Sequence, residues 1–171
     1  VTMLAIWQAG GIYVPLDATL PEQRLRSILA ELKDRVLIAD ASVAAALIQP
    51  DTLAMTSLWA GSEPAEQDWD SAASMHSGYM MFTSGSTGKP KGVLVSQGNL
   101  SAALSAFGQL FKVTPHDRML ALTTFSFDIS LLELLLTLVH GGSVYVAAEQ
   151  SQRDAEKLAC PNTPNTPPKH T

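Results

Sequence analysis

The hydrophobic residues of this chain follow two different spacings. After Pro21, a residue that suits the first turn of a helix, Leu25 and Leu29 recur at helical spacing and predict a helix with one apolar face. Short apolar runs at residues 36–39 and 119–123 have instead the length of buried strands. The pattern therefore predicts strands that alternate with helices.

Glycines, prolines and small polar residues set the bounds of the other predicted elements. A first helix ends at Gly10, and a later one is capped by Asn99 and directs Leu104 and Leu110 inward. The run at 129–139 is apolar nearly all round, which predicts a buried helix. A further helix is predicted at 42–48, a surface connection at 61–77, and strands at 12–16, 36–39, 53–58, 79–83, 92–95, 119–123 and 143–147.

Alternating strands and helices predict an α/β fold with a mostly parallel sheet and flanking helices. A length of 171 residues suits one domain with a sizeable core. Residues 159–171 are rich in Pro, Asn and Thr, and a segment with so few apolar side chains is expected to be disordered. We therefore expect a folded part at 1–158 and a disordered tail at 159–171.

Composition and charge exclude several classes of function. A net charge of −5 without a long basic run argues against a nucleic-acid partner. The most apolar stretch, 129–139, is too short to span a bilayer and contains Glu133. The single cysteine, Cys160, fits a reducing compartment, no signal sequence opens the chain, and the four histidines lack metal-ligand spacing. We expect a cytoplasmic protein with no membrane contact and no metal ligands of its own.

The most informative segment is TSGSTGKPKG, residues 83–92, which lies between two predicted strands. Its glycines let the backbone turn with positive φ and approach a ligand closely, and successive backbone N–H groups in such a turn attract anions. Its serine and threonine hydroxyls can donate further hydrogen bonds, while Lys89 and Lys91 add positive charge. These groups together suit a polyphosphate.

The segment is not a Walker A phosphate loop, which needs Gly five residues before its Gly-Lys pair and Ser or Thr directly after the Lys. Thr83 stands at the first of these positions and Pro90 at the second. A solvated Gly/Ser turn without a ligand is the remaining alternative. The ordered hydroxyls and the Pro-Lys-Gly ending favour the phosphate interpretation.

Three segments carry a resemblance to a known family. Residues 79–100, YMMFTSGSTGKPKGVLVSQGNL, closely resemble the phosphate-binding core motif of the adenylate-forming superfamily. Residues 5–29 resemble the adenylation-domain motif with Ala-Gly, Tyr-x-Pro-hydrophobic-Asp and Pro-x-x-Arg. Residues 125–142 resemble the later motif in which Phe-Asp-x-Ser is followed by a helix and Gly-Gly. In this order, over roughly residues 1–158, they resemble the adenylation domains of nonribosomal peptide synthetases.

The resemblance implies an incomplete portion of the large N-terminal subdomain of an adenylate-forming enzyme. In that family ATP and a carboxylic acid, here an amino acid, give an acyl-adenylate and pyrophosphate, and Mg²⁺ usually shares the work. The product passes to a phosphopantetheine thiol on a carrier protein, so carrier-protein and condensation domains are the implied partners. The substrate carboxylate is itself the nucleophile, and no residue of this chain is assigned a catalytic role.

The resemblance also implies roles for individual residues. Tyr13, Asp17 and Arg24 of the first motif are expected to be structural, with Asp17 and Arg24 close enough to pair. The residues expected around the ATP phosphates are Thr83, Ser84, Gly85, Ser86, Thr87, Gly88 and Lys91.

Asp128 is the predicted substrate contact. In family members that use α-amino acids, the Asp of Phe-Asp-x-Ser pairs with the substrate ammonium group, and Asp128 occupies that position. A charge-assisted pair of this kind is strong once desolvated. From its position alone, Asp128 serves equally well as the N-cap of the helix that begins at Ile129.

The family's later motifs, including the ribose-binding Asp and the C-terminal subdomain with its catalytic Lys, do not follow in these 171 residues. The chain on its own is therefore predicted to be inactive. Two other interpretations stay open: a fragment of an acyl- or aryl-CoA ligase, against which Asp128 argues, and a truncated product without catalytic function.

Overall fold

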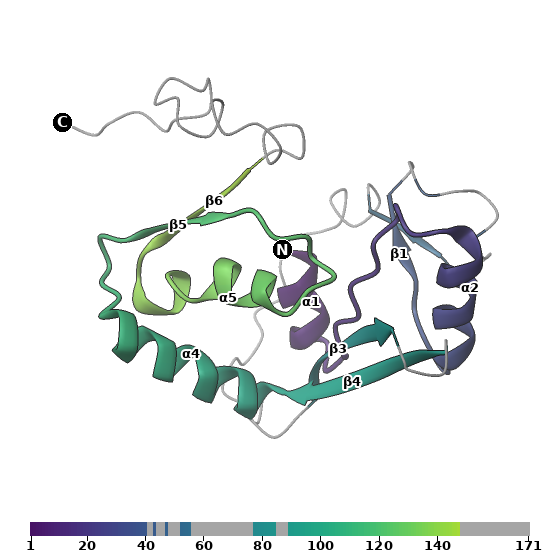
Figure 1. Cartoon of the computed structure of the whole chain (residues 1–171), viewed down its shortest axis with the longest axis horizontal. Coiled ribbons are helices and arrows are strands. Elements are labelled where there is room, and N and C mark those ends of the chain that lie inside the picture. The colour runs from purple at the N-terminus through teal and green to yellow at the C-terminus, as the bar shows by residue number, and fades with distance from the viewer. Residues whose placement is uncertain (41–42, 44–46, 48–51, 56–76, 85–88, 148–171) are drawn as a thin grey trace. The chain divides into compact units, whose positions relative to one another are not determined.

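The computed structural model describes residues 1–40, 43, 47, 52–55, 77–84 and 89–147. It divides into two compact units, an N-terminal unit (Val1–Ala102) and a C-terminal unit (Ala103–Thr171), and each is considered by itself. Figure 1 shows the elements of both. Residues 61–76 of the predicted connection at 61–77, most of the predicted helix at 42–48 and the tail at 159–171 lie outside the described residues.

The N-terminal unit begins with helices α1 (Thr2–Gln8) and α2 (Glu22–Glu31). Pro21 precedes α2, and the predicted apolar face is confirmed, since Leu25, Ile28 and Leu29 are buried. The core of this unit gathers around that face with Leu47. Strands β1 (Ile38–Ala39) and β2 (Leu53–Ala54) form a parallel pair.

A longer hairpin completes the N-terminal unit. Strands β3 (Ser77–Ser84) and β4 (Pro90–Ser96) pair antiparallel. Beside β3, the Tyr13 N–H donates to the Gly78 carbonyl (3.1 Å) and the Met80 N–H donates to the Tyr13 carbonyl (2.9 Å). The predicted strand at 12–16 is therefore only a single parallel bridge, Tyr13 to Tyr79, because Pro15 lacks the N–H that a longer ladder needs.

The C-terminal unit contains a strand–helix–strand motif. Strands β5 (Arg118–Ala121) and β6 (Ser143–Val146) are parallel neighbours, and helix α5 (Ile129–Leu135) connects them through a 3₁₀ turn, η3 (Leu138–His140). Figure 1 shows α5 between these strands and the second half of α4 (Gln97–Phe111). Two parallel pairs alternating with helices confirm the predicted α/β class.

Two helices differ from their predicted form. Helix α4 begins at Gln97, and the Ser96 hydroxyl accepts the Asn99 N–H (3.1 Å), so Ser96 rather than Asn99 caps it. Leu104 is buried, but Leu110 is 69% exposed. The inward position of Leu110 was wrong because the buried residues of α4 are Leu104 and Gly108, which packs beside His140, and Leu110, two residues after Gly108, lies on the opposite side of the helix.

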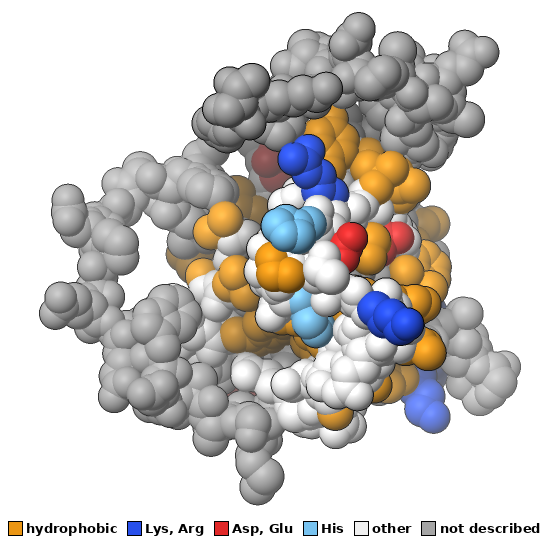
Figure 2. Space-filling view, turned by 90° about the vertical axis from the view of Figure 1, so that its left-hand side faces the viewer, with side chains coloured by type: hydrophobic (Ala, Val, Ile, Leu, Met, Phe, Trp, Pro, Cys, Tyr) orange, Lys and Arg blue, Asp and Glu red, His pale blue; other side chains and the backbone are white. Residues whose placement is uncertain are grey.

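The predicted buried helix at 129–139 is also shorter and less buried than expected. Leu131 and Leu135 are buried, whereas Ile129 and Val139 are more than half exposed. Residues 130–137 are buried or half-buried all round, as predicted, and only the two ends of the run are exposed. Figure 2 shows hydrophobic side chains standing among charged ones on the face that it draws. None of the described helices is long and apolar enough to cross a membrane.

Candidate functional site

The glycine-rich segment connects the two strands of the β3–β4 hairpin. Ser84 pairs with Pro90 and Thr83 pairs with Lys91. Residues directly opposite each other in an antiparallel pair direct their side chains to the same face, so the Thr83 hydroxyl and the Lys91 ammonium share one face of the hairpin. The Thr83 hydroxyl also donates to the Lys91 carbonyl (3.4 Å), a long bond that joins the two strands at this end.

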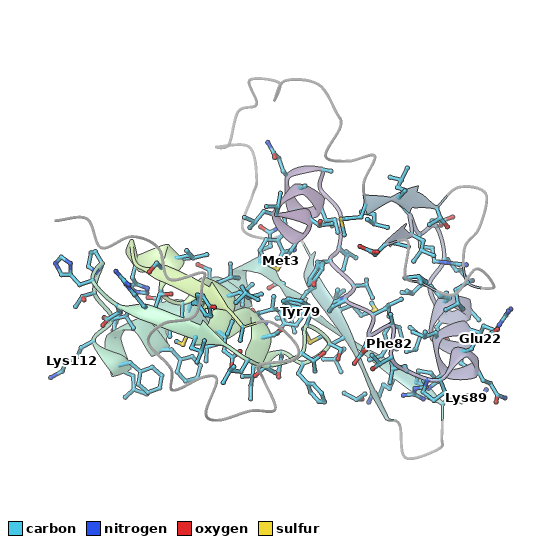
Figure 3. The ribbon with its side chains drawn as sticks, turned by 90° about the horizontal axis from the view of Figure 1, so that it is seen from above. Met3, Glu22, Tyr79, Phe82, Lys89 and Lys112 are labelled. Carbon is cyan, nitrogen blue, oxygen red and sulfur yellow. The ribbon has the colours of Figure 1, made fainter. Side chains whose placement is uncertain are left out.

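Cationic side chains gather around this end of the hairpin. Lys89 and Lys91 are exposed, and Figure 3 shows Lys89 at the hairpin end beside α2, the helix that carries Glu22. From the same helix, Arg24 Nη2 donates to the Thr83 carbonyl (3.2 Å). The hairpin end therefore combines a hydroxyl group with positive charge, the chemistry that an anion requires.

The predicted pairing of Asp17 with Arg24 does not occur. Asp17 Oδ1 accepts hydrogen bonds from the Thr19 N–H (2.8 Å) and the Thr19 hydroxyl (2.6 Å) instead. Arg24 reaches the Thr83 carbonyl. The Asp17 carboxylate finds its hydrogen-bond donors within its own turn, and Arg24 instead connects α2 to the strand that leads into the glycine-rich segment.

The predicted phosphate-binding residues are described to different extents. Thr83 is exposed at the end of β3, Lys91 is exposed in β4, and Ser84 is described by its backbone alone. The other predicted contacts lie outside the described residues: Gly85, Ser86, Thr87 and Gly88.

Residues of the first motif hold the far end of the hairpin. The Trp7 indole N–H and the Tyr13 backbone N–H both donate to the Gly78 carbonyl. A Cβ atom on Gly78 would lie 3.0 Å from the Gln97 nitrogen, so a larger residue here would require the neighbouring backbone to shift by a few tenths of an ångström. Burial raises the pKa of Tyr13. Tyr13 therefore has a structural role: its backbone hydrogen bonds hold the start of the chain against β3.

Asp128 stands at the N-terminus of α5, seven residues after the end of β5. Its Oδ1 accepts the Ile129 N–H (2.9 Å), and the side chain is exposed. Ligands of parallel α/β sheets bind beyond the carboxyl ends of the strands, and Asp128 follows such an end. The capping interpretation is confirmed, and the substrate role stays a prediction. Asp128 belongs to the C-terminal unit, whereas Thr83 and Lys91 belong to the N-terminal unit.

Glu133 is a residue of this region that the sequence analysis did not single out. Its carboxylate, in α5, accepts three hydrogen bonds from Leu122 and Thr123, the residues that follow β5. The sequence did hold a signal for this interaction. A carboxylate inside an otherwise apolar run is costly to bury unless it is hydrogen-bonded, so Glu133 needed partners nearby.

A comparison with protein families identifies the fold that carries these residues. The model of a family described as AMP-binding enzyme matches residues 1–164. The chain belongs to the AMP-binding enzyme family. This match confirms the family resemblance that the three sequence motifs indicated.

The AMP-binding enzymes that resemble this chain include peptide synthetases. A dimodular nonribosomal peptide synthase of Bacillus subtilis (strain 168) is 37% identical over 168 residues, which cover 92% of this chain and 7% of that protein. D-lysergyl-peptide-synthetase subunit 1 of Epichloe festucae var. lolii is 37% identical over 164 residues, covering 90% of this chain and 4% of its own length. The chain thus spans less than a tenth of these curated relatives.

A solved structure from the same family has the same fold. The crystal structure of a four-domain nonribosomal peptide synthetase bound to AMP and glycine is 32% identical, with a TM-score of 0.76. The match covers 91% of this chain and 12% of that one. The expected fold, part of the N-terminal subdomain of an adenylate-forming enzyme, is confirmed.

Proposed function

We propose that this chain takes part in the ATP-dependent activation of an amino acid as an aminoacyl-adenylate within a nonribosomal peptide synthetase. The observation that carries the proposal is the hairpin end, where Thr83 and Lys91 face each other across the strands that flank the TSGSTGKPKG segment. Relatives that are peptide synthetases support it. On this basis we assign residues 1–158 to the adenylation domain and residues 159–171 to a tail.

The proposed reaction joins the substrate carboxylate to the α-phosphate of ATP. A carboxylate oxygen forms a bond to the α-phosphorus, the bond from that phosphorus to the bridging oxygen breaks, and pyrophosphate leaves with the electron pair. The protein's task is to align the two substrates and stabilise charge on the departing group. Lys91 would supply positive charge, and the hydroxyls and N–H groups of residues 83–88 would donate hydrogen bonds to the phosphates.

Asp128 would bind the other end of the amino acid. Its carboxylate is exposed and one oxygen is engaged by the Ile129 N–H, so an ammonium group can approach the other oxygen. This assignment makes the substrate an α-amino acid and not a fatty acid, and it favours a peptide synthetase over a CoA ligase.

The described residues at the hairpin end suit the negative charge of ATP, and they offer few ligands to a metal ion. Lys89 and Lys91 are exposed cations at the hairpin end. Among the residues that the structure describes, no group of three or more His, Cys, Asp or Glu side chains could hold a metal ion. Mg²⁺ commonly binds through substrate phosphates and one or two carboxylates. When bound, it would neutralise phosphate charge.

The proposed partners follow from the fate of the product. An aminoacyl-adenylate in a peptide synthetase passes its acyl group to the phosphopantetheine thiol of a carrier domain. Carrier and condensation domains of the same synthetase are therefore the proposed partners, in agreement with the modular proteins to which the chain is similar.

Amino-acid-dependent exchange of labelled pyrophosphate into ATP tests the proposal. The assay uses the full-length protein that contains these residues and the common amino acids one at a time. We expect exchange with a small set of amino acids. Lys91→Ala is expected to lower kcat/KM for ATP on the order of 100-fold, and Asp128→Asn to raise the KM for the amino acid on the order of 100-fold.

Matched variants separate these effects from general damage. Lys33→Ala removes an exposed cation outside the proposed site, and Asp34→Asn makes the same amide substitution at a residue with positive φ (51°), which Asn tolerates. Both are expected to leave exchange unchanged. A soluble, folded protein without exchange for any amino acid would contradict the proposed function.

A further inference from the structure

We propose that Glu133 is a positioning residue that fixes the direction of the Asp128 carboxylate by holding the backbone between β5 and α5. The proposal rests on the proposed function, because it assumes that Asp128 binds the substrate ammonium. It assigns to Glu133 no contact with substrate.

The Glu133 carboxylate uses both of its oxygens. Oε2 accepts the backbone N–H groups of Leu122 and Thr123, each at 2.8 Å. Oε1 accepts the Thr123 hydroxyl, also at 2.8 Å. Hydrogen bonds to an ionised carboxylate are about twice as strong as neutral ones. A half-buried side chain in the second turn of α5 is therefore fastened to the residues directly after β5.

These bonds close a loop with Asp128 at its centre. Thr123 precedes Asp128 by five residues, and Glu133 follows it by five. Inside the loop, the Phe127 carbonyl accepts the Ser130 hydroxyl (2.6 Å) and the Ser130 N–H (3.0 Å). The loop is thus held at its ends by Glu133 and near its centre by Ser130.

Apolar packing does not hold this segment. The large apolar side chains that flank Asp128 in the sequence are exposed, with Phe125 at 51%, Phe127 at 61% and Ile129 at 57%. Hydrogen bonds are then the main restraint on the path of the backbone between Thr123 and Asp128. An apolar residue at position 133 would be easier to bury among the leucines, but it would release the segment.

The two carboxylates of the segment divide two tasks. Glu133 is occupied by three donors from its own chain, and Asp128 is exposed with a single backbone donor on one oxygen. Only Asp128 is therefore open to an ammonium group. Small displacements of a binding group weaken catalysis strongly, so the restraint imposed by Glu133 matters to the substrate as well as to the fold.

The first test compares KM values in the full-length protein by pyrophosphate exchange. Thr123→Val deletes one of the three bonds at constant size, and Glu133→Ala deletes all three. We expect the KM for the amino acid to rise about threefold and on the order of tenfold, respectively, with the KM for ATP unchanged. A merely structural role would lower the active fraction, and with it kcat, without moving either KM.

Thr137→Val is the matched control, because the Thr137 hydroxyl makes a comparable bond to the Ser143 carbonyl (3.0 Å) elsewhere in the C-terminal unit. We expect it to leave the KM for the amino acid unchanged. An unchanged KM in Thr123→Val and Glu133→Ala, in a protein where Asp128→Asn raises it, would overturn the proposal and leave the proposed function intact.

Amide hydrogen exchange gives a readout that needs no activity. In Glu133→Ala, the amides of Phe127 and Ile129 are expected to exchange on the order of tenfold faster than in the unmodified protein, and in Thr137→Val at the unmodified rate. Equal rates in Glu133→Ala and the unmodified protein would overturn the proposal. If the protein lacks pyrophosphate exchange, the proposed function fails and the amide rates alone decide whether Glu133 holds this segment.

Discussion

The two connections that carry the predicted binding residues are held in different ways. The β3–β4 connection is held at its described ends by the pairing of the two strands, to which side chains add only single contacts, from Arg24 to the Thr83 carbonyl (3.2 Å) and from the Thr83 hydroxyl to the Lys91 carbonyl (3.4 Å). The β5–α5 connection is tied by three bonds of 2.8 Å to one carboxylate, that of Glu133.

The difference fits the two ligands that we propose. A triphosphate is a large anion with many acceptor oxygens, so its site needs several donors and cations that stay available, as exposed Lys89 and Lys91 do. An ammonium group needs one carboxylate held in one direction. The restraint around Asp128 is already present in the protein, which reduces the ordering that binding must impose.

The largest expected effect compares the two anchors directly. Glu133→Ala leaves two N–H groups and a hydroxyl without their charged acceptor, and should lower the free energy of unfolding by about 2–3 kcal/mol. Arg24→Ala, at an exposed contact, should cost less than about 1 kcal/mol. Urea unfolding of the two variants checks this. Equal losses would remove the distinction between the connections.

Two glycines sharpen the same comparison. A Cβ on Gly142 would lie 2.6 Å from the Asp117 carbonyl oxygen, part of the backbone beside β5, whereas a Cβ on Gly92 would lie 2.8 Å from the Met80 sulfur, in a flexible side chain. Gly142→Ala should therefore destabilise by about 1–3 kcal/mol, and Gly92→Ala by less. Thermal unfolding measures both, and a larger loss in Gly92→Ala would be the opposite of what we expect.

Tyr13 gives a pH dependence to the docking of the chain start against β3. Burial raises the pKa of Tyr13 above its ordinary value of 10.0. A raised pKa means that the folded state holds the proton more tightly, so stability is complete below pH 10 and falls as the pH rises through the folded value. The Tyr13→Phe variant should lose less stability than the unmodified protein over this alkaline range, as measured by unfolding at each pH. Identical alkaline curves would exclude the contribution of Tyr13.

The smallest expected effect is at Asp117, just before β5. The backbone N–H and hydroxyl of Thr114 donate to its carboxylate at 2.7 and 3.0 Å and lower the pKa of Asp117 below its ordinary value of 3.8. The Asp117 carboxylate therefore stabilises the folded state above its ordinary pKa, and this stabilisation is lost as the pH falls through the lower pKa of the folded state. Acid unfolding of Asp117→Asn should show a slightly weaker pH dependence, and an unchanged curve would contradict this.

The sequence was sufficient for most elements but not for their contacts. Helix α2 followed from the spacing of Leu25 and Leu29, and the Gly-Gly pair of the third motif marks where the helical stretch ends, at Gly141 with a φ of 82°. Leu110 was misplaced because burial depends on what covers a helix, which its own periodicity does not contain. The site residues Thr83, Lys91 and Asp128 came from motifs.

The residues that hold the site could not be found in the same way. Arg24 and Glu133 act over separations of 59 and 10–11 residues. The local sequence therefore predicted that Arg24 pairs with Asp17, which is close to it in the chain. It showed Glu133 only as a single charge in an apolar run. Such pairings follow from the fold, and only the fold shows which partner is within reach.

Amide hydrogen exchange of the full-length protein with and without MgATP tests the central claim most directly. We predict that MgATP slows exchange in a peptide covering residues 83–92 several-fold, while a peptide covering residues 122–130 is protected already and slows further only when the activated amino acid is added. Unchanged exchange at residues 83–92 in saturating MgATP would contradict the account, because the hairpin end would then not be the phosphate site.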